Sequence, residues 1–381
     1  MTRTIELLGR LVAFDTVSGN SNLEMVTFID DFLSERGFRT FRVPSPCGRK
    51  AGLFASAGPD GAGILLSAHS DVVPVSGQSW RRDPFRLTEE NGRLYGRGTT
   101  DMKGFLASML ALADRVAGSE LGKPLKFVVS YDEEIGCVGI ENMIDALPNA
   151  LGKPLICIVG EPTSMKVAIG HKGKVKLNAV CRGKSGHSAL APHYVNAIHL
   201  AMDFIDELRR LQNWYRLHGA NDPEHDIPYS TVHVGRISAG TTINIVPEFA
   251  EIGFEFRHLP AETPEGVLGR IRAAADRAAS KHLPIHPGAA IEITQINSYP
   301  GLDVPADAKV TLLARSLSGT DFITKVAFGT EAGVFGRLGI PTVVCGPGSM
   351  GGQGHKPDEF VSVSQLDACD AMMGRILTAL T

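Results

Sequence analysis

Histidine and acidic side chains recur in this chain at the ends of apolar runs, and such side chains can bind divalent cations. The first is His69, which follows the apolar run Gly63–Leu66 and has Asp71 two residues further on. A histidine that binds a metal usually donates its other ring N–H to a carboxylate or a carbonyl, and Asp71 is placed to orient the imidazole in this way. Most H-x-D pairs are ordinary polar loop residues, so the motifs that follow decide the interpretation.

Further acidic and histidine positions follow in sequence. The strand LKFVVSY continues into Glu133 and Glu134, the strand LICIVG ends at Glu161, and an apolar helix is expected to open at Asp101. An acid at that place can also be a simple N-cap or first-turn residue of the helix. The candidate set is His69, Asp101, Glu133, Glu134, Glu161 and His355.

The residue types of this set predict the kind of metal. Carboxylates with imidazoles suit zinc, cobalt or manganese, rather than a thiolate site or an all-oxygen calcium cage. Two histidines with three carboxylates are too many for one tetrahedral zinc, but they fit two metals roughly 3.5 Å apart that share a carboxylate. The adjacent Glu133 and Glu134 fit a division of labour in which one binds metal and the other transfers protons as a general base.

The elements around these motifs predict an α/β fold. Three Val/Ile/Leu-rich runs end in a carboxylate or a histidine, with helical patterns between them. This alternation is typical of a mostly parallel sheet flanked by helices, in which ligands bind beyond the carboxyl ends of the strands.

The pattern changes after residue 173. We expect strands at Val175–Arg182, Tyr229–Ile237, Thr241–Arg257 and Ala290–Gln295, and helices at Asn196–Tyr215 and Pro264–His282. This order is typical of a separate α+β unit with an antiparallel sheet. The first pattern then resumes, with helices at Ala306–Leu317 and Ser364–Leu380. We therefore predict a metal-binding catalytic domain of residues 1–173 and 297–381, and an inserted domain of residues 174–296.

Composition excludes several classes of function. The chain has 381 residues, 43% of them hydrophobic and 21% charged, with a formal net charge of -3. These values give no electrostatic case for nucleic acid or an anionic membrane. No apolar segment is long enough to span a bilayer. The N-terminal run IELLGRLVAF has the pattern of an amphipathic helix rather than of a signal peptide. We therefore expect a soluble, cytoplasmic protein. The six cysteines form no C-x-x-C pair and are expected to be reduced and structural.

Taken together, the motifs resemble those of the co-catalytic zinc deacylases and exopeptidases. This family includes carboxypeptidase G, aminoacylase, succinyl-diaminopimelate desuccinylase and acetylornithine deacetylase. The matching motifs are His69-Ser-Asp71, Gly98-Thr-Thr-Asp101-Met-Lys-Gly104, Asp132-Glu133-Glu134, Gly160-Glu161-Pro-Thr163 and the late His355. They occur in the family order, and the resemblance covers essentially the whole chain.

The resemblance implies a role for each residue of the set. Asp101 would bridge two divalent metal ions, with zinc expected and cobalt as the alternative. One metal would be completed by His69 and Glu161, and the other by Glu134 and His355. Asp71 would orient His69, and Glu133 would be the base that activates the attacking water. The family also often has a cis peptide after the bridging aspartate, here Asp101–Met102.

The inserted domain resembles the family's lid and dimerisation domain, which implies a homodimer. His187, in Gly186-His187-Ser188, matches the histidine that reaches a neighbouring active site and hydrogen-bonds the developing oxyanion. Asn244 and Arg257 match positions that hold a substrate carboxylate. Without the resemblance, His187 would be read as a turn residue and Arg257 as a surface charge at a strand edge.

Within the family, two late segments look most like the acetylornithine deacetylase branch. They are Gly329-Thr-Glu-Ala-Gly333 and Cys345-Gly-Pro-Gly-Ser349. Charge complementarity suggests that Glu331 receives the side-chain ammonium of the small-molecule substrate N2-acetyl-L-ornithine. A desuccinylase, an aminoacylase, a dipeptidase and a non-catalytic amino-acid-binding relative are the alternatives. A serine hydrolase is excluded because no G-x-S-x-G motif is present, and GPGSMGGQGHK does not supply a P-loop.

Overall fold

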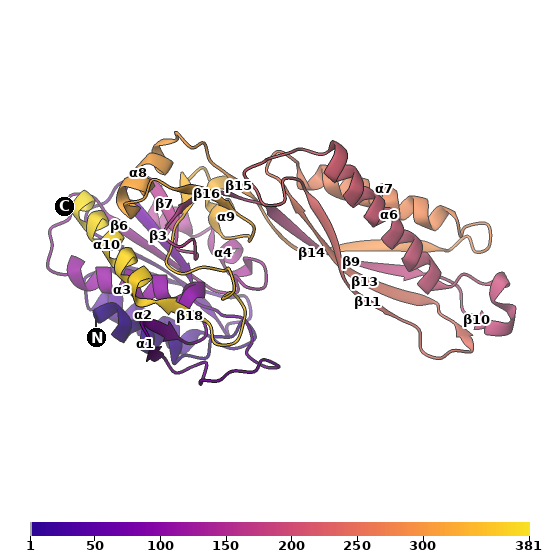
Figure 1. Ribbon diagram of the computed structural model, residues 1–381, viewed down its shortest axis with the longest axis horizontal. Helices are drawn as coiled ribbons and strands as arrows, with labels where there is room; N and C mark the ends of the chain where they lie inside the picture. The colour runs from indigo at the N-terminus through magenta and orange to yellow at the C-terminus, as the bar shows by residue number, and fades with distance from the viewer. Residues whose placement is uncertain (1) are drawn as a thin grey trace. The chain divides into compact units, whose positions relative to one another are not determined.

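The computed structural model describes residues 2–381, and the chain divides into two compact units. Unit 1 contains the chain up to Gly170, Leu302–Val326 and Thr330–Thr381, and unit 2 contains His171–Gly301 and Ala327–Gly329. Unit 2 is thus inserted between two parts of unit 1 along the chain. The two units are drawn in Figure 1 and are described one at a time.

Unit 1 is built on a nine-stranded mixed sheet with the order β1-β2-β6-β3-β7-β17-β8-β15, and β16 pairs with β8 beside this path. Its strands are β1 (Arg39–Pro44), β2 (Ala51–Ala57), β3 (Ile64–His69), β6 (Leu125–Ser130), β7 (Ile156–Val159), β8 (Val167–His171), β15 (Leu302–Asp303), β16 (Ile323–Val326) and β17 (Thr342–Val344). The predicted α/β class with flanking helices is confirmed. The four central strands β6, β3, β7 and β17 pair in parallel. The pairs β1–β2, β2–β6 and β17–β8 are antiparallel.

Helices of unit 1 pack on this sheet. They are α1 (Arg3–Val12), α2 (Leu23–Ser34), α3 (Gly104–Val116), α4 (Val138–Met143), α5 (Leu147–Leu151), α8 (Lys309–Ser318), α9 (Ala332–Arg337) and α10 (Val363–Leu380). The first helix begins after Thr2, whose hydroxyl accepts a hydrogen bond from the backbone N–H of Ile5. The second ends at Ser34, and the chain turns away at Gly37, whose φ of 78° is a left-handed conformation that glycine adopts without steric cost.

Helix α3 was expected to open at Asp101, and this prediction is wrong. The helix begins at Gly104, and Asp101 lies before it in the irregular turn Thr99–Lys103 with φ -121° and ψ 91°. The peptide bond between Asp101 and Met102 is cis. Asp101 therefore does not cap the helix, and its side chain is available for another role.

Three short strands form a separate small sheet in unit 1, which the sequence pattern did not reveal. They are β4 (Thr88–Glu90), β5 (Arg93–Tyr95) and β18 (Phe360–Ser362), in the order β18-β5-β4. Each has only three residues, too few for a period-2 pattern to be recognised. The sheet joins segments that are more than 250 positions apart in sequence, because Phe360 pairs with Tyr95.

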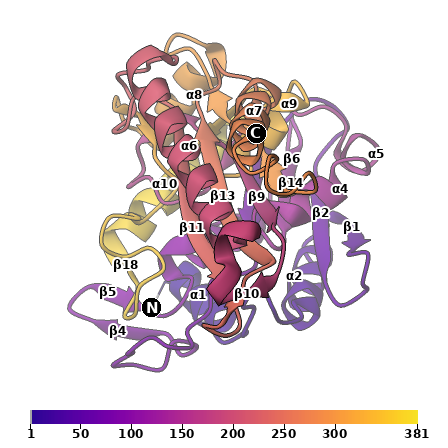
Figure 2. The ribbon, with the colours of Figure 1, turned by 90° about the vertical axis from the view of Figure 1, so that its right-hand side faces the viewer.

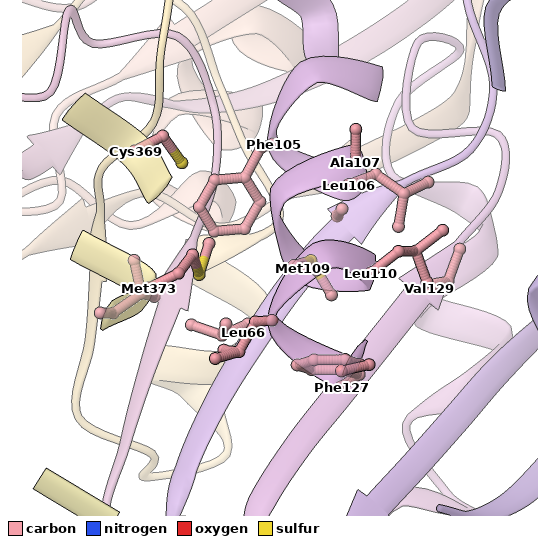
Figure 3. Close-up of a cluster of buried hydrophobic side chains, with 14 of the residues drawn as sticks. Leu66, Phe105, Leu106, Ala107, Met109, Leu110, Phe127, Val129, Cys369 and Met373 are labelled. Carbon is pink, nitrogen blue, oxygen red and sulfur yellow. The ribbon is translucent and has the colours of Figure 1, made fainter. Parts of the chain in front are cut away.

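The hydrophobic core of unit 1 lies where α3 crosses the central strands (Figure 3). The face of α3 contributes Phe105, Met109 and Leu110, and it meets Leu66 of β3 and Phe127 of β6. Helix α10 packs beside α3 and contributes Cys369 and Met373 to the same cluster. This packing fixes the strands whose carboxyl ends carry the candidate ligands.

Truncation of Phe105 tests the contribution of this core. Phe105 is fully buried and lies against Gly160, where an added Cβ would be 1.9 Å from its ring atom Cδ1. Phe105→Ala is expected to lower the free energy of unfolding by about 3–5 kcal/mol, because it removes a large apolar side chain and leaves a cavity. Denaturant unfolding measures this change. Phe322, which is 70% exposed, gives the control, and Phe322→Ala should change stability by less than about 0.5 kcal/mol.

Unit 2 is an α+β unit with an antiparallel four-stranded sheet in the order β11-β13-β9-β14. Its elements are β9 (Gly173–Arg182), β10 (Gly186–His187), the 3-10 helix Ser188–His193, α6 (Ala197–His218), β11 (Thr231–Ala239), β12 (Ile245–Val246), β13 (Phe249–His258), α7 (Pro264–Ser280) and β14 (Ala290–Tyr299). Helices α6 and α7 pack side by side along one face of the sheet (Figures 1 and 2). One long strand was expected at Thr241–Arg257, but Pro247 separates β12 from β13, since proline cannot donate a ladder hydrogen bond.

Candidate metal centre

Three neighbouring strands bring candidate ligands to one edge of the large sheet. His69 is the last residue of β3, Glu133 and Glu134 follow β6, and Glu161 follows β7. Strand β3 pairs in parallel with both β6 and β7, so the carboxyl ends of the three strands meet at the same edge. The structure thus brings together residues that lie up to 92 positions apart in sequence.

Asp101 lies between the two histidines of the set. Its Oδ1 is 3.1 Å from Nε2 of His69, and its Oδ2 is 3.4 Å from Nε2 of His355. Each histidine has a second carboxylate beside it: Glu161 Oε1 lies 3.6 Å from His69 Nε2, and Glu134 Oε2 lies 3.1 Å from His355 Nε2. The arrangement consists of two histidine–glutamate pairs joined by one aspartate.

Two groups of donor atoms in this cluster are close enough to surround a cation. One is His69, Glu133 and Glu161, and the other is His69, Asp101 and Glu134, with all donor atoms in each group within 4.8 Å of one another. Nitrogen and carboxylate oxygen donors of this kind suit zinc and similar divalent metals. His355 is the most exposed member, since half of its side chain is accessible.

Electrostatics in the cluster favour a bound cation. Burial, together with the neighbouring carboxylates, raises the pKa of Glu133 and of Glu161 well above its usual value. Burial and the Asp101 carboxylate raise the pKa of Glu134 to about 7. Burial would raise the pKa of Asp101 as well, but its hydrogen bonds with His355 and His69 lower it. A divalent cation would offset the repulsion between these carboxylates.

Asp71 supports the site in a different way from the one predicted. The ring atom Nδ1 of His69 lies 2.9 Å from the backbone carbonyl oxygen of Asp71 and 3.5 Å from its carboxylate. The carboxylate instead accepts hydrogen bonds from the backbone N–H groups of Glu133 at 3.0 Å and Glu134 at 3.3 Å, and from the Ser18 hydroxyl at 2.7 Å. Asp71 therefore orients His69 mainly through its main chain and positions the two glutamates through its side chain.

Metal binding to this cluster is expected to release protons. Hydrogen bonds with Asp101 and Glu134 raise the pKa of His355 to about 10, so the imidazole is protonated at pH 7 in the metal-free protein. A metal ligand must be deprotonated, and the metal therefore competes with protons and binds more tightly as the pH rises. Calorimetric titration at pH 7 in two buffers of different ionisation enthalpy should show release of at least one proton. Identical heats in both buffers would contradict this prediction, and His355→Ala should reduce the number of protons released.

The remaining predicted site residues of unit 2 lie in two places. His187 in β10 pairs with Ile245, and the carbonyl oxygen of Asn244 accepts a hydrogen bond from Ser188 N, so His187 and Asn244 are neighbours. His187 is exposed, and its Nδ1 accepts a hydrogen bond from Ala189 N. Arg257 lies near the other end of β13, where its Nε donates to Glu255 Oε1 at 2.9 Å.

Glu331, for which the sequence predicts a substrate contact, lies in the interior of unit 1. Glu331 precedes α9 and is 1% exposed, and Ser67 Oγ lies 3.5 Å from its Oε2. Burial raises its pKa to about 7. His69 and Glu161 of the candidate centre are buried to a similar degree, so the role of Glu331 in substrate binding stays a prediction. The sequence argument rested on charge alone, which does not report burial.

Sequence reasoning also missed side chains that hold the ligand-bearing loops. Lys50 binds the Asp132 carboxylate and the Ser18 carbonyl oxygen in the interior, next to the segment that carries Glu133. Arg97 and Glu359 form a second buried pair beside Asp101. The charge of Glu359 in the motif GHKPDEF was visible in the sequence, but the backbone groups that it contacts were not.

Other expectations concern the whole chain. All six cysteines are free, and five of them are buried, whereas Cys47 is exposed. Among residues 2–381, every helix is too short or too polar to cross a membrane.

Comparison with known proteins establishes the family. The sequence profile of Peptidase family M20/M25/M40 matches residues 65–379. An acetylornithine deacetylase of Pasteurella multocida (strain Pm70) is 33% identical over 390 residues, which cover 98% of this chain and 97% of that protein. An acetylornithine deacetylase of Aliivibrio fischeri (strain MJ11) is 34% identical over 329 residues, with 86% and 84% covered.

Solved structures show the same fold. The M20 family metallo-carboxypeptidase of Sulfolobus solfataricus matches with a TM-score of 0.81 at 21% identity, with 99% of each chain covered. A tripeptidase of Staphylococcus aureus matches with a TM-score of 0.78 at 19% identity, with 99% and 98% covered. The chain therefore belongs to Peptidase family M20/M25/M40, and it is a metal-dependent hydrolase of that family.

Proposed function

We propose that this protein is a dinuclear metallohydrolase that removes the acetyl group from N2-acetyl-L-ornithine, giving ornithine and acetate. The observation that carries the dinuclear site is Asp101, whose two oxygens face two different histidines, each with its own glutamate. The substrate is supported by relatives named acetylornithine deacetylase, about one third identical over nearly the whole chain. The reaction would serve arginine biosynthesis in the cytoplasm.

The residues divide into two ligand sets that share Asp101. His69 and Glu161 would complete one set, and Glu134 and His355 the other, with zinc as the expected metal and cobalt as the alternative. Metals held there would polarise the acetyl carbonyl and lower the pKa of water in the site.

Glu133 is left for proton transfer. It lies within the cluster beside His69 and Glu161 but is outside both proposed ligand sets. The backbone N–H of Glu133 donates a hydrogen bond to the Asp71 carboxylate, and this contact orients Glu133 at the site. As general base, Glu133 would take a proton from the attacking water while the water oxygen bonds to the acetyl carbon; the C–N bond then breaks, and Glu133 returns the proton to the departing amine. The second water proton leaves the acetic acid for the amine, so water and amide are converted into acetate and a protonated amine with no other reactant.

The spread of site residues over unit 2 supports action as a homodimer. His187 and Asn244 lie beside β12, shortly before β13 begins at Phe249, and Arg257 lies eight positions further along β13. At about 3.3 Å per residue this is about 26 Å, more than one acetylated amino acid can span. If His187 and Asn244 contact the same substrate as Arg257, they must come from different copies of the chain. We therefore propose that one subunit supplies His187 and Asn244 to the active site of its partner.

Metal reconstitution and a substrate panel test this function. Protein stripped with a chelator should be inactive, and activity on N2-acetyl-L-ornithine should return with one to two equivalents of zinc or cobalt. The rate should exceed those on succinyl-diaminopimelate, acetylmethionine and dipeptides. Metal-dependent activity on another member of the panel would retain the mechanism and change the substrate. The absence of metal uptake and of activity on every substrate would contradict the proposal in favour of a binding protein.

A further inference from the structure

A buried carboxylate, Glu359, holds the turn that carries Asp101. Its Oε1 accepts hydrogen bonds from the backbone N–H groups of Thr100 at 2.9 Å and Asp101 at 3.1 Å. Its Oε2 accepts from the backbone N–H of Gly98 at 3.1 Å. A carboxylate that receives several backbone N–H bonds fixes the main chain around it, because each donor would otherwise be buried without a partner.

Arg97 neutralises this carboxylate and extends the contact to the loop of His355. Its NH1 donates to Glu359 Oε2 at 2.7 Å and to the carbonyl oxygen of Lys356 at 3.3 Å. Its NH2 donates to Gln78 Oε1 at 2.6 Å. Arg97 and Glu359 are each 1% exposed. A pair so deeply buried is costly to break, because either partner alone would be an uncompensated charge.

Gln78 completes the connection. Its Nε2 donates to the carbonyl oxygen of His355 at 2.8 Å, while its Oε1 accepts from both Arg97 and the indole N–H of Trp80. The main chain of residues 355 and 356 is therefore held by Gln78 and Arg97, and the main chain of Asp101 by Glu359. One hydrogen-bond network, buried at Arg97 and Glu359 and half-buried at Gln78, thus joins the two segments that meet across the candidate metal centre.

The two histidines differ in how much they depend on such support. His69 ends a fully buried strand, and its ring is held by the carbonyl oxygen of Asp71. His355 lies in a loop outside any strand or helix, has a φ of 61°, and is half exposed. Its position relative to Asp101 is set by the loop backbone, which Gln78 and Arg97 hold.

We infer that Arg97 and Glu359 are positioning residues that set the distance between Asp101 and His355, and so control binding of the metal on the His355 side. This inference rests on the proposed dinuclear function. Loss of the pair weakens the site formed by Asp101, Glu134 and His355 more than the site that contains His69 and Glu161. Removing a group that supports metal ligands in this way typically costs about 10- to 100-fold in metal affinity.

Cobalt titration of metal-free protein tests the inference by calorimetry and visible absorption. The wild-type protein should take up two equivalents, and His355→Ala identifies the step that belongs to the His355 side. In Glu359→Gln, that step should weaken about 10- to 100-fold, whereas the other should stay within about threefold of wild type. Arg97→Lys keeps the charge but not the planar fork, and should weaken the same step to a smaller extent. The visible spectrum of the cobalt ion bound in the weakened step should differ from that in the wild-type protein, whereas the spectrum of the ion bound in the other step should be the same.

Two further variants separate positioning from general damage. Gln78→Ala removes the contact with the His355 carbonyl oxygen without leaving a buried charge, and it should weaken the same step if Glu359→Gln does not fold. Asp370→Asn is the matched control, because Asp370 also accepts hydrogen bonds in the interior of unit 1, from Thr4 and Ser108. It should leave both cobalt steps unchanged.

The outcomes are distinguishable. Suppose that the wild-type protein shows two cobalt-binding steps. If both affinities are unchanged in Glu359→Gln, or if both fall by the same factor, the inference is overturned and the proposed function stays intact. If Glu359→Gln does not fold, an unchanged His355-side step in Gln78→Ala overturns it. A wild-type protein that takes up no cobalt would overturn the proposed function and this inference together.

Discussion

Glu133→Ala is expected to abolish turnover while the metal content stays near that of the wild-type protein. Glu133 lies in the cluster but outside the two proposed ligand sets, so its loss removes proton transfer and leaves the metal ligands in place. A positioned general base contributes about 10²- to 10⁴-fold to the rate, and kcat should fall by at least this factor. Steady-state kinetics with metal analysis of the same preparation measures both quantities.

Glu134→Ala provides the contrast for this experiment. Its Oε2 lies 3.1 Å from His355 Nε2, and the proposal makes it a metal ligand. The Glu134→Ala protein should therefore lose metal as well as activity. If Glu133→Ala lost metal to the same extent, Glu133 would be a ligand, and the assignment of the two glutamates would be wrong.

His187→Ala is expected to lower kcat by about 10²- to 10³-fold, the usual cost of removing one oxyanion donor. KM should change much less, because the interaction strengthens in the transition state. The nearby His193 is also exposed, at the end of the short 3-10 helix that follows His187, and His193→Ala should leave kcat unchanged. Metal content should be the same in both variants, since neither residue belongs to the metal centre.

Mixing two inactive variants tests whether His187 acts on the partner subunit. In a heterodimer of Glu133→Ala and His187→Ala chains, one active site would carry both defects and the other neither. Equal amounts of freely exchanging subunits should thus recover about one quarter of wild-type activity, since half the dimers are mixed and each has one intact site. If mass spectrometry shows that subunits have exchanged but no activity is recovered, His187 acts within its own chain or has no part in the reaction.

The sequence predicted those parts of the candidate metal centre for which the local sequence pattern and the strand order lead to the same place. His69, Glu133, Glu134 and Glu161 each follow an apolar strand, and parallel strands bring their carboxyl ends to one edge. His355 has no such strand before it; its residue type in GQGHKPDEF made it a candidate, and the family resemblance implied its role as a metal ligand. The resemblance implied that Asp101 is shared between the sets of His69 and His355, but the sequence pattern alone could not place it there, because its position depends on a turn that no periodicity describes.

The failures have a common physical cause. Whether a charge is buried depends on residues distant in sequence, so the sequence did not show that Glu331 lies in the interior. The same holds for Glu359, whose partners are backbone groups more than 250 positions away. The strands β4, β5 and β18 were missed because three residues show no alternation.

The order of the ligands along the chain has a consequence for biosynthesis. His69, Asp101, Glu134 and Glu161 all precede unit 2, whereas His355 follows it. A growing chain that has reached unit 2 thus carries four of the five proposed ligands and would lack His355 for the second proposed metal. On this proposal the hydrolase becomes competent only after the ribosome has passed the whole insertion, and fragments that end within unit 2 should bind metal incompletely and stay inactive.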